Sequence, residues 1–277
     1  MPIRRRAAPT SGFGAEYHEI GLATDISGLS AVLREHTMWD SHVHLAAYPD
    51  PARVVAHAAR RGIRLVSVTV ATVEAAPNLR LRATTTGLRC FLGVHPSEAT
   101  KSPIDLSELN ALWDSADGVG EVGLDPKYSD TSGASKQMEL FRAQVHVASR
   151  KGKPLQVHSR GAEAACLDEV DGFSLRSVLF HWFESEELLD RAVGGNRRFV
   201  SFGPAVIYSK RLQRIAARCP PESVLTESDG PVGFAAIAGA EGPGLIPSVV
   251  FKLAELWHIP WDETVSRISK NSETYLG

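Results

Sequence analysis

The stretch KQMELFRAQVHVASRKGKPLQVHSR, residues 136–160, decides the fold. Its first part has the apolar spacing of an amphipathic helix, and Gly152 at its end is a typical helix stop. A short apolar run, Leu155–His158, follows that glycine and is typical of a buried strand. Helices that alternate with buried strands build parallel sheets. The stretch therefore predicts an α/β fold.

The same alternation of short apolar runs and helix-like segments holds from Thr37 onward. The segment PARVVAHAARRG, residues 51–62, is another predicted helix that ends at a glycine. The predicted strands are Met38–Val43, Leu65–Val70, Leu88–Gly93, Gly118–Val122, Leu155–His158, Val178–His181, Phe199–Gly203 and Val224–Glu227. Such a series in about 240 residues predicts a TIM-type (β/α)8 barrel. We expect residues 37–277 to form this barrel as a single domain, with residues 1–36 as an N-terminal extension. The pattern leaves a doubly wound open sheet as the alternative.

Composition describes an ordinary soluble globular protein. Of the 277 residues, 43% are hydrophobic and 22% are charged. Three cysteines are odd in number and widely separated, which favours a reducing compartment and predicts a cytoplasmic protein. A net charge of -2 gives no global attraction to nucleic acid. No apolar run approaches the roughly 18 residues of a transmembrane helix, so no membrane association is expected.

The stretch WDSHVHL, residues 39–45, places two histidines one residue apart after an aspartate. In an extended strand, residues two apart point to the same face, so His42 and His44 present both imidazoles to one object. A metal ion is the obvious candidate. An exposed pair of histidines near a turn also occurs by chance, so the other ligands must come from elsewhere in the chain.

Metal-capable side chains fall at the ends of several predicted strands. They are His42, His44, Glu121, His158, His181 and Asp229. Taken singly, the carboxylates are more often loop or cap residues, and the histidines more often satisfied, partly buried residues. In a barrel, however, the carboxyl ends of the strands surround one mouth. Four histidines and two carboxylates on one rim are what two divalent ions need, with a carboxylate bridging them.

Two such ions activate water and stabilise both the attacking and the leaving oxygen of a displacement reaction. The implied reaction is therefore hydrolysis of a phosphoester or an amide. Phosphate fits a two-cation site best. Three further side chains are candidates for substrate binding: His95, Arg160 and Trp182. Arginine has the planar fork suited to phosphate, and a tryptophan at the mouth can stack on a base. His95 is equally a candidate turn residue or support for a ligand, Arg160 a solvated one, and Trp182 a core or rim residue.

Nucleophilic catalysis has little support in the sequence. Cys166 falls in a predicted helix and Cys219 precedes two prolines, so both are interpreted as structural. The sequence contains no Gly-x-Ser-x-Gly elbow, Walker loop or Gly-x-Gly-x-x-Gly fingerprint.

Six motifs resemble, in order, the signatures of the TatD-like metal-dependent hydrolases of the amidohydrolase superfamily. They are DSHVHL, FLGVHP, GVGEVGLD, QMELFRAQVHVASRKGKPLQVHSR, VLFHWF and VLTESDGP, and they cover roughly residues 37 to 277. The resemblance implies that His42, His44, Glu121 and Asp229 hold one metal, and that Glu121, His158 and His181 hold the other. It also implies that Asp229 orients or deprotonates the nucleophilic water, and that the activity is a metal-dependent DNase action on single-stranded ends.

The sequence departs from this family after the sixth strand. The family segment resembles HCFSG, whereas this chain reads HWFES, so the substrate-facing loop lacks a glycine and gains Glu184. The stretches HLAAYPDPARVV, HWF and SFGPA look more like the TatD branch of Qat-type anti-phage defence clusters. That likeness implies partner proteins and a docking role for residues 1–36.

Three hypotheses follow for the function. The first is a two-metal deoxyribonuclease. The second keeps the site but takes a small amide or ester substrate, and it predicts indifference to DNA. The third is a metal-containing binding subunit of a defence complex, although a complete open ligand set argues against a purely structural site. Mixed histidine and carboxylate ligation is compatible with Zn, Mn or Mg.

Overall fold

A computed structural model of the chain describes residues 37–101, 106–129, 131–231 and 242–277. The predicted N-terminal extension, residues 1–36, lies outside the described residues. Residues Thr37–Gly277 form one compact unit. Its strands are β1 (Met38–Val43), β2 (Ile63–Ser67), β3 (Leu88–Leu92), β4 (Gly118–Gly123), β5 (Leu155–His158), β6 (Val178–Phe180), β7 (Arg198–Phe202) and β8 (Val224–Thr226).

These strands form a parallel barrel. Each strand pairs with the next in the sequence, in the order β1 to β8. The ends of the series meet, because Val43 bridges to Gly230 in parallel, and the Asp229 amide donates to the His42 carbonyl at 3.0 Å. The His44 amide likewise donates to the Gly230 carbonyl at 2.9 Å. The predicted TIM-type barrel is therefore confirmed, and the open-sheet alternative was wrong.

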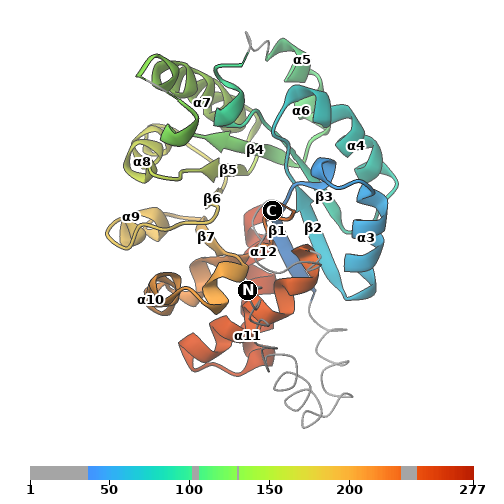
Figure 1. The fold of residues 1–277 in the computed structure, drawn as a ribbon, viewed down its shortest axis with the longest axis vertical. Coiled ribbons are helices and arrows are strands. Elements are labelled where there is room, and N and C mark those ends of the chain that lie inside the picture. Colours follow the sequence, from blue (N-terminus) through green and yellow to red (C-terminus); the bar gives the residue numbers. More distant parts are fainter. Residues whose placement is uncertain (1–36, 102–105, 130, 232–241) are drawn as a thin grey trace, which may run out of the picture. The chain divides into compact units, whose positions relative to one another are not determined.

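Helices surround the ring of strands (Figure 1). They are α3 (Pro51–Arg60), α4 (Ala75–Ala83), α5 (Ser107–Asn110), α6 (Leu112–Ser115), α7 (Thr131–Lys151), α8 (Glu163–Asp171), α9 (Leu189–Val193), α10 (Lys210–Arg218), α11 (Ile246–Trp257) and α12 (Trp261–Leu276). Helix α3 begins where the Asp50 side chain accepts a hydrogen bond from the Arg53 amide at 3.0 Å. Both predicted glycine stops are confirmed, since Gly62 and Gly152 have φ values of 67° and 60°. Among the described residues, no helix has the length and apolar character needed to span a membrane.

The core packs apolar strand residues against the last helix. The buried cluster comprises Trp39, Val66, Val68, Phe91, Leu179, Phe199, Leu225 and Tyr275. Tyr275 comes from α12, and its hydroxyl donates to the Leu155 carbonyl at 3.1 Å. Its backbone carbonyl accepts from the Ser177 hydroxyl at 2.6 Å. The C-terminal helix is thus bonded to β5 and to the residue before β6, which stabilises the frame that holds the site.

Strand β2 differs from its predicted span, Leu65–Val70, because it begins at Ile63 and ends at Ser67. After Ser67, the chain stays buried but leaves the regular ladder. The Thr69 hydroxyl donates to the Gly93 carbonyl at 2.7 Å and accepts from the Gly93 amide at 2.8 Å. A side chain therefore replaces the backbone partner that a continued strand would supply. An apolar run such as VSVTV does not reveal this exchange.

The Trp113 indole, fully buried on α6, provides a test of this packing. It donates to the Leu92 carbonyl at 2.8 Å, at the end of β3. We expect Trp113→Phe to lower the free energy of unfolding by about 1–3 kcal/mol, because a buried acceptor loses its donor. Trp257→Phe is the matched control: its indole donates to the Ala216 carbonyl at 2.8 Å, but the side chain is only half-buried and water can replace it. Urea denaturation checks the difference, and equal losses would contradict it.

Candidate metal centre

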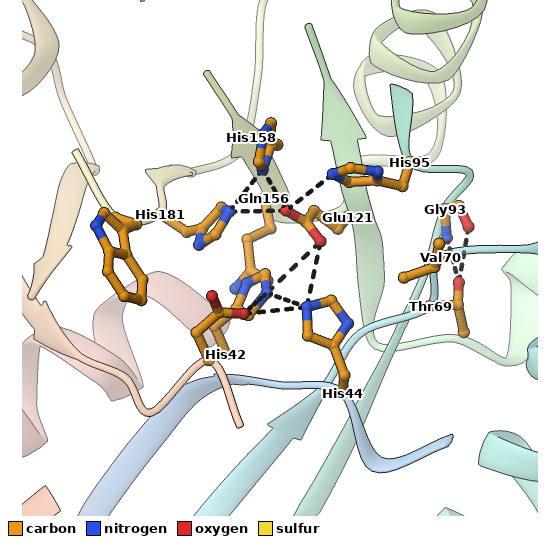
Figure 2. Close-up of polar contacts among 12 residues, drawn as sticks. His42, His44, Thr69, Val70, Gly93, His95, Glu121, Gln156, His158 and His181 are labelled. Carbon is orange, nitrogen blue, oxygen red and sulfur yellow. Dashed lines mark hydrogen bonds and ion pairs between the residues drawn. The ribbon is translucent and has the colours of Figure 1, made fainter. Parts of the chain in front are cut away.

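Glu121 lies in β4 and has a pair of histidines at each carboxylate oxygen (Figure 2). One oxygen, Oε1, is 2.8 Å from Nδ1 of His158 and 2.7 Å from Nε2 of His181. The other, Oε2, is 3.6 Å from Nε2 of His42 and 3.5 Å from Nε2 of His44. The strands therefore bring the predicted ligands together around a single carboxylate, as expected when strand ends share one barrel mouth.

Asp229 lies beside the first histidine pair. Its Oδ1 is 3.1 Å from Nε2 of His44 and 3.5 Å from Nε2 of His42. Its φ of 50° falls in the left-handed region, which is uncommon for residues other than glycine. The hydrogen bond from the Asp229 amide to the His42 carbonyl holds Asp229 in this conformation. Such strained positions concentrate at functional sites, where the surrounding structure holds them.

The distances fit a site for divalent ions. Within each histidine pair, the facing ring nitrogens are 3.1 Å apart, between His42 and His44 and between His158 and His181. Tetrahedral coordination with bonds of about 2.0–2.1 Å separates ligand atoms by about 3.4 Å. Among the described residues, three groups of side chains each bring their potential ligand atoms within 4.8 Å of one another. One of these groups is His42, His44 and Asp229. Imidazole and carboxylate together are the donors that such ions use in hydrolases.

Electrostatics also favour a cation at Glu121. Burial alone would raise the pKa of this carboxyl, but the charge of His181 and a hydrogen bond from His158 hold it well below its usual range. Burial disfavours a charged His181, yet the charge of Glu121 outweighs it and raises the pKa of the ring well above normal. The buried carboxylate thus stays ionised and needs a positive partner. Metal ions compete with protons for such ligands.

Two further carboxylates lie beside two of the predicted ligand histidines. His158 contacts Oδ2 of Asp125 through Nε2 at 2.8 Å, which leaves Nδ1 for Glu121. His181 faces Oε2 of Glu227 through Nδ1 at 3.6 Å. The contact of His158 with Asp125 is at hydrogen-bond distance and is of the kind that fixes the tautomer of a metal-binding histidine, whereas the distance from His181 to Glu227 is too long for a hydrogen bond. Neither Asp125 nor Glu227 was predicted. The available signal was a carboxylate near a strand end, in the motifs GVGEVGLD and VLTESDGP.

Asp40, also unpredicted, ties the first strand to the last. Its fully buried carboxylate accepts from the Ser228 amide at 2.9 Å, the Ser228 hydroxyl at 2.6 Å and the His42 amide at 3.3 Å. Burial raises its pKa to about 7. The contacts hold the segment that carries Asp229 against the one that carries His42. The signal was the aspartate in WDSHVHL, whose partner Ser228 lies 188 residues later in the sequence.

His95 faces Glu121 and presents an N–H hydrogen, rather than a nitrogen lone pair, toward that carboxylate. Its Nδ1 accepts from the Ser97 amide at 3.1 Å. Burial lowers its pKa to about 3, so the ring is neutral and its proton resides on Nε2. That nitrogen lies 3.7 Å from Oε1 of Glu121. Although His95, Glu121 and His158 lie close enough to share an ion, the tautomer makes His95 a donor toward the site.

A cavity of about 810 Å³ opens from this centre, and Arg160 and Trp182 both line it. Arg160 donates to Oδ2 of Asp125 through Nε at 2.8 Å, and its guanidinium lies 5.3 Å from the ring centre of Tyr128. Both candidates therefore line the same cavity as the predicted ligands His158, His181 and Asp229. The structure also shows that Arg160 is held by a carboxylate that supports His158.

Glycines let the central strands approach one another. A Cβ on Gly93 would lie 2.8 Å from the carbonyl oxygen of Glu121. Gly123 has a φ of 146°, which side chains rarely adopt. These constraints favour glycine at both positions, Gly93 and Gly123.

The cysteines do not provide a nucleophile. Cys166 and Cys219 are buried, and burial raises the pKa of both thiols, that of Cys219 to about 12. Reactive cysteines have lowered pKa values and solvent access. The interpretation of both residues as structural agrees with these surroundings.

Comparison with known proteins agrees with this geometry. The chain matches the family described as TatD related DNase over residues 39–277. An uncharacterized metal-dependent hydrolase of Haemophilus influenzae is 24% identical over 86% of this chain and 98% of its own length. The human deoxyribonuclease TATDN3 is 29% identical over 50% of this chain and 56% of its own length. The crystal structure of a TatD homologue from Escherichia coli K12 has a TM-score of 0.77 and 25% identity, covering 86% of this chain and 97% of that one.

Proposed function

The chain belongs to the TatD related DNase family of metal-dependent hydrolases, and we propose that it is a deoxyribonuclease that hydrolyses phosphodiester bonds at single-stranded DNA ends. The observation that carries the proposal is the Glu121 carboxylate, with one histidine pair at each oxygen. Two metal positions that share a bridging carboxylate suit the attacking and leaving oxygens of a phosphoester displacement.

Two divalent ions would be held by this arrangement. His42, His44, Glu121 and Asp229 would hold one, and Glu121, His158 and His181 the other, as Zn, Mn or Mg. Such ions supply Lewis acidity, which activates water near neutral pH and offsets charge on the phosphate. We infer a cytoplasmic enzyme from the three cysteines, which are free and buried.

The remaining residues would act on the substrate directly. Asp229, within 3.5 Å of both first-pair histidines, would orient the attacking water and accept its proton. The Nε2 hydrogen of His95 can donate to a phosphate oxygen as negative charge develops there. Arg160 and Trp182, on the cavity wall, would contact a phosphate and a base.

The His95 tautomer leads to a specific prediction. We expect His95→Ala to lower kcat about 10²-fold while bound metal per chain stays unchanged, because the residue donates a hydrogen bond instead of a lone pair. His95→Gln, which keeps an N–H donor, should recover part of the loss. Steady-state kinetics and metal analysis of the same samples check both points. Loss of an ion from His95→Ala would show that this residue is a ligand.

The direct test of the proposed function uses end-labelled single-stranded DNA. The full chain is chelated, reconstituted with Mg²⁺, Mn²⁺ or Zn²⁺ in turn, and incubated with the DNA. Cleavage that appears only on reconstitution would support the deoxyribonuclease and select the ion. A folded, metal-loaded protein that leaves every single-stranded and double-stranded DNA intact would contradict it.

One observation favours a second candidate, a hydrolase of a small amide or ester. The cavity is lined by more carboxylates than cationic side chains, which is unfavourable for a long polyanion. Turnover of neutral esters together with indifference to DNA would support this alternative. Metal binding without any turnover would instead support a binding subunit. The defence setting and partner proteins implied by the Qat-type resemblance stay predictions.

A further inference from the structure

The segment after β6 forms a fixed wall of the cavity. Trp182 has a φ of 45°, and its amide donates to Oε1 of Glu227 at 2.9 Å. Its indole donates to Oε1 of Glu184 at 3.0 Å. The other oxygen of Glu184 accepts from Arg211 at 3.0 Å. Both the tryptophan ring and the Glu184 carboxylate are therefore held in place beside the metal centre.

The charge on this wall is negative. The carboxylates that line the cavity are Glu163, Glu184, Glu186, Glu187 and Asp229, and the cations are Lys127, Arg160 and Arg211. Arg160 is paired with Asp125, Arg211 with Glu184, and Arg214 with Glu186. The lining carboxylates outnumber the lining lysine and arginine side chains by five to three. Three of the carboxylates, Glu184, Glu186 and Glu187, lie between β6 and α9, a few residues after His181. Bound ions would attract a phosphate at the inner end, whereas the wall repels one.

We propose that this cavity receives the terminal nucleoside of a DNA strand, and that Glu184 restricts cleavage to ends that carry a free hydroxyl group. The inference rests on the proposed function, since it concerns the same metal centre. A volume of about 810 Å³ is in the range of sites that enclose small molecules, and one nucleoside is of that class. Its base would stack on Trp182.

Glu184 distinguishes the two kinds of end by charge. A hydroxyl group can donate to the carboxylate in a charge-assisted hydrogen bond. A terminal phosphate carries a charge of about -1.5 to -2 near neutral pH and would face the same carboxylate across a partly enclosed space. In the reaction, the water oxygen bonds to phosphorus, and the bond from phosphorus to the ester oxygen of the remaining strand breaks. That oxygen takes a proton and becomes the hydroxyl group of the new strand end, so the shortened strand again presents the end that the cavity accepts. The terminal unit leaves as a nucleoside monophosphate.

Four versions of one internally labelled single-stranded oligonucleotide test the proposal. They carry hydroxyl groups at both ends, a phosphate at the 5′ end, a phosphate at the 3′ end, or phosphates at both ends. With the metal-loaded full chain, we expect a phosphate at one end to slow degradation at least about tenfold, and a phosphate at the other end to have little effect. Glu184→Gln should reduce that discrimination about fivefold.

Two controls separate specificity from general damage. Glu139→Gln changes an exposed glutamate of α7 that does not line the cavity, and it should keep the full discrimination. The chromogenic diester bis(p-nitrophenyl) phosphate has no terminal phosphate, so Glu139→Gln should hydrolyse it at the wild-type rate, and the rate of Glu184→Gln on it serves to normalise the oligonucleotide rates of that variant. Equal degradation of all four oligonucleotides, or faster degradation of phosphorylated ends, would overturn this inference alone. If no oligonucleotide is cleaved, the proposed function fails and the inference fails with it.

Discussion

Glu121→Gln removes metal-dependent hydrolysis, with an expected fall in kcat of about 10³-fold or more. The neutral amide of glutamine cannot offer an anionic oxygen to each of the two metal ions. It also leaves the surrounding histidines without the buried charge that raises the pKa of His181. We therefore expect fewer bound ions per chain as well as lower activity. Kinetics and metal analysis on the same preparation measure both effects.

Glu169→Gln is the matched control for this substitution. Glu169 is another largely buried glutamate, on α8, and it accepts two hydrogen bonds from Arg142 at 2.8 and 2.7 Å. Because it lies in no set of potential ligand atoms among the described residues, Glu169→Gln should keep the metal content and activity of the natural chain. If Glu121→Gln retained the same metal content and kcat, the shared carboxylate would have no role.

Asp229→Asn separates proton transfer from metal binding. The asparagine keeps an oxygen near His44 but loses basicity, so we expect kcat to fall about 10²- to 10⁴-fold. The ion at the second histidine pair, His158 and His181, should be retained. Glu121→Gln differs, because it is expected to lose both activity and bound metal. Measurements of kcat, KM and metal content distinguish the two variants.

The comparison for this variant is Asp190→Asn. Asp190 is exposed on α9 and pairs with Arg218 at 2.8 Å, so its substitution should leave kcat unchanged. An Asp229→Asn protein with wild-type kcat would show that another group takes the proton. Complete loss of metal from the same variant would show that Asp229 acts only as a ligand.

The barrel could be predicted because its signals are local. Apolar strand runs, helical spacing and the glycines after α3 and α7 each depend on neighbouring residues. The six ligand candidates followed from one rule, that strand ends share a mouth. Closure of β8 onto β1 could not be read from the pattern, because the bond from Asp229 to the His42 carbonyl joins distant segments.

The supporting residues were missed for the same reason. Asp125 and Glu227 each follow or end a strand, where a carboxylate is more often a cap or loop residue. Their importance depends on distances to His158 and His181, which the sequence does not contain. His95 was left between two roles, and only the hydrogen bond from the Ser97 amide identifies which nitrogen carries the proton. Side-chain tautomers follow from contacts rather than from spacing.

The most direct test of the account is the anomalous scattering of Mn²⁺ in crystals of the reconstituted chain. The account predicts two peaks, one beside each oxygen of the Glu121 carboxylate, with His42 and His44 at the first and His158 and His181 at the second. A map with no peak at Glu121, or with peaks that contact neither histidine pair, would contradict the central claim that this carboxylate is shared by two ions.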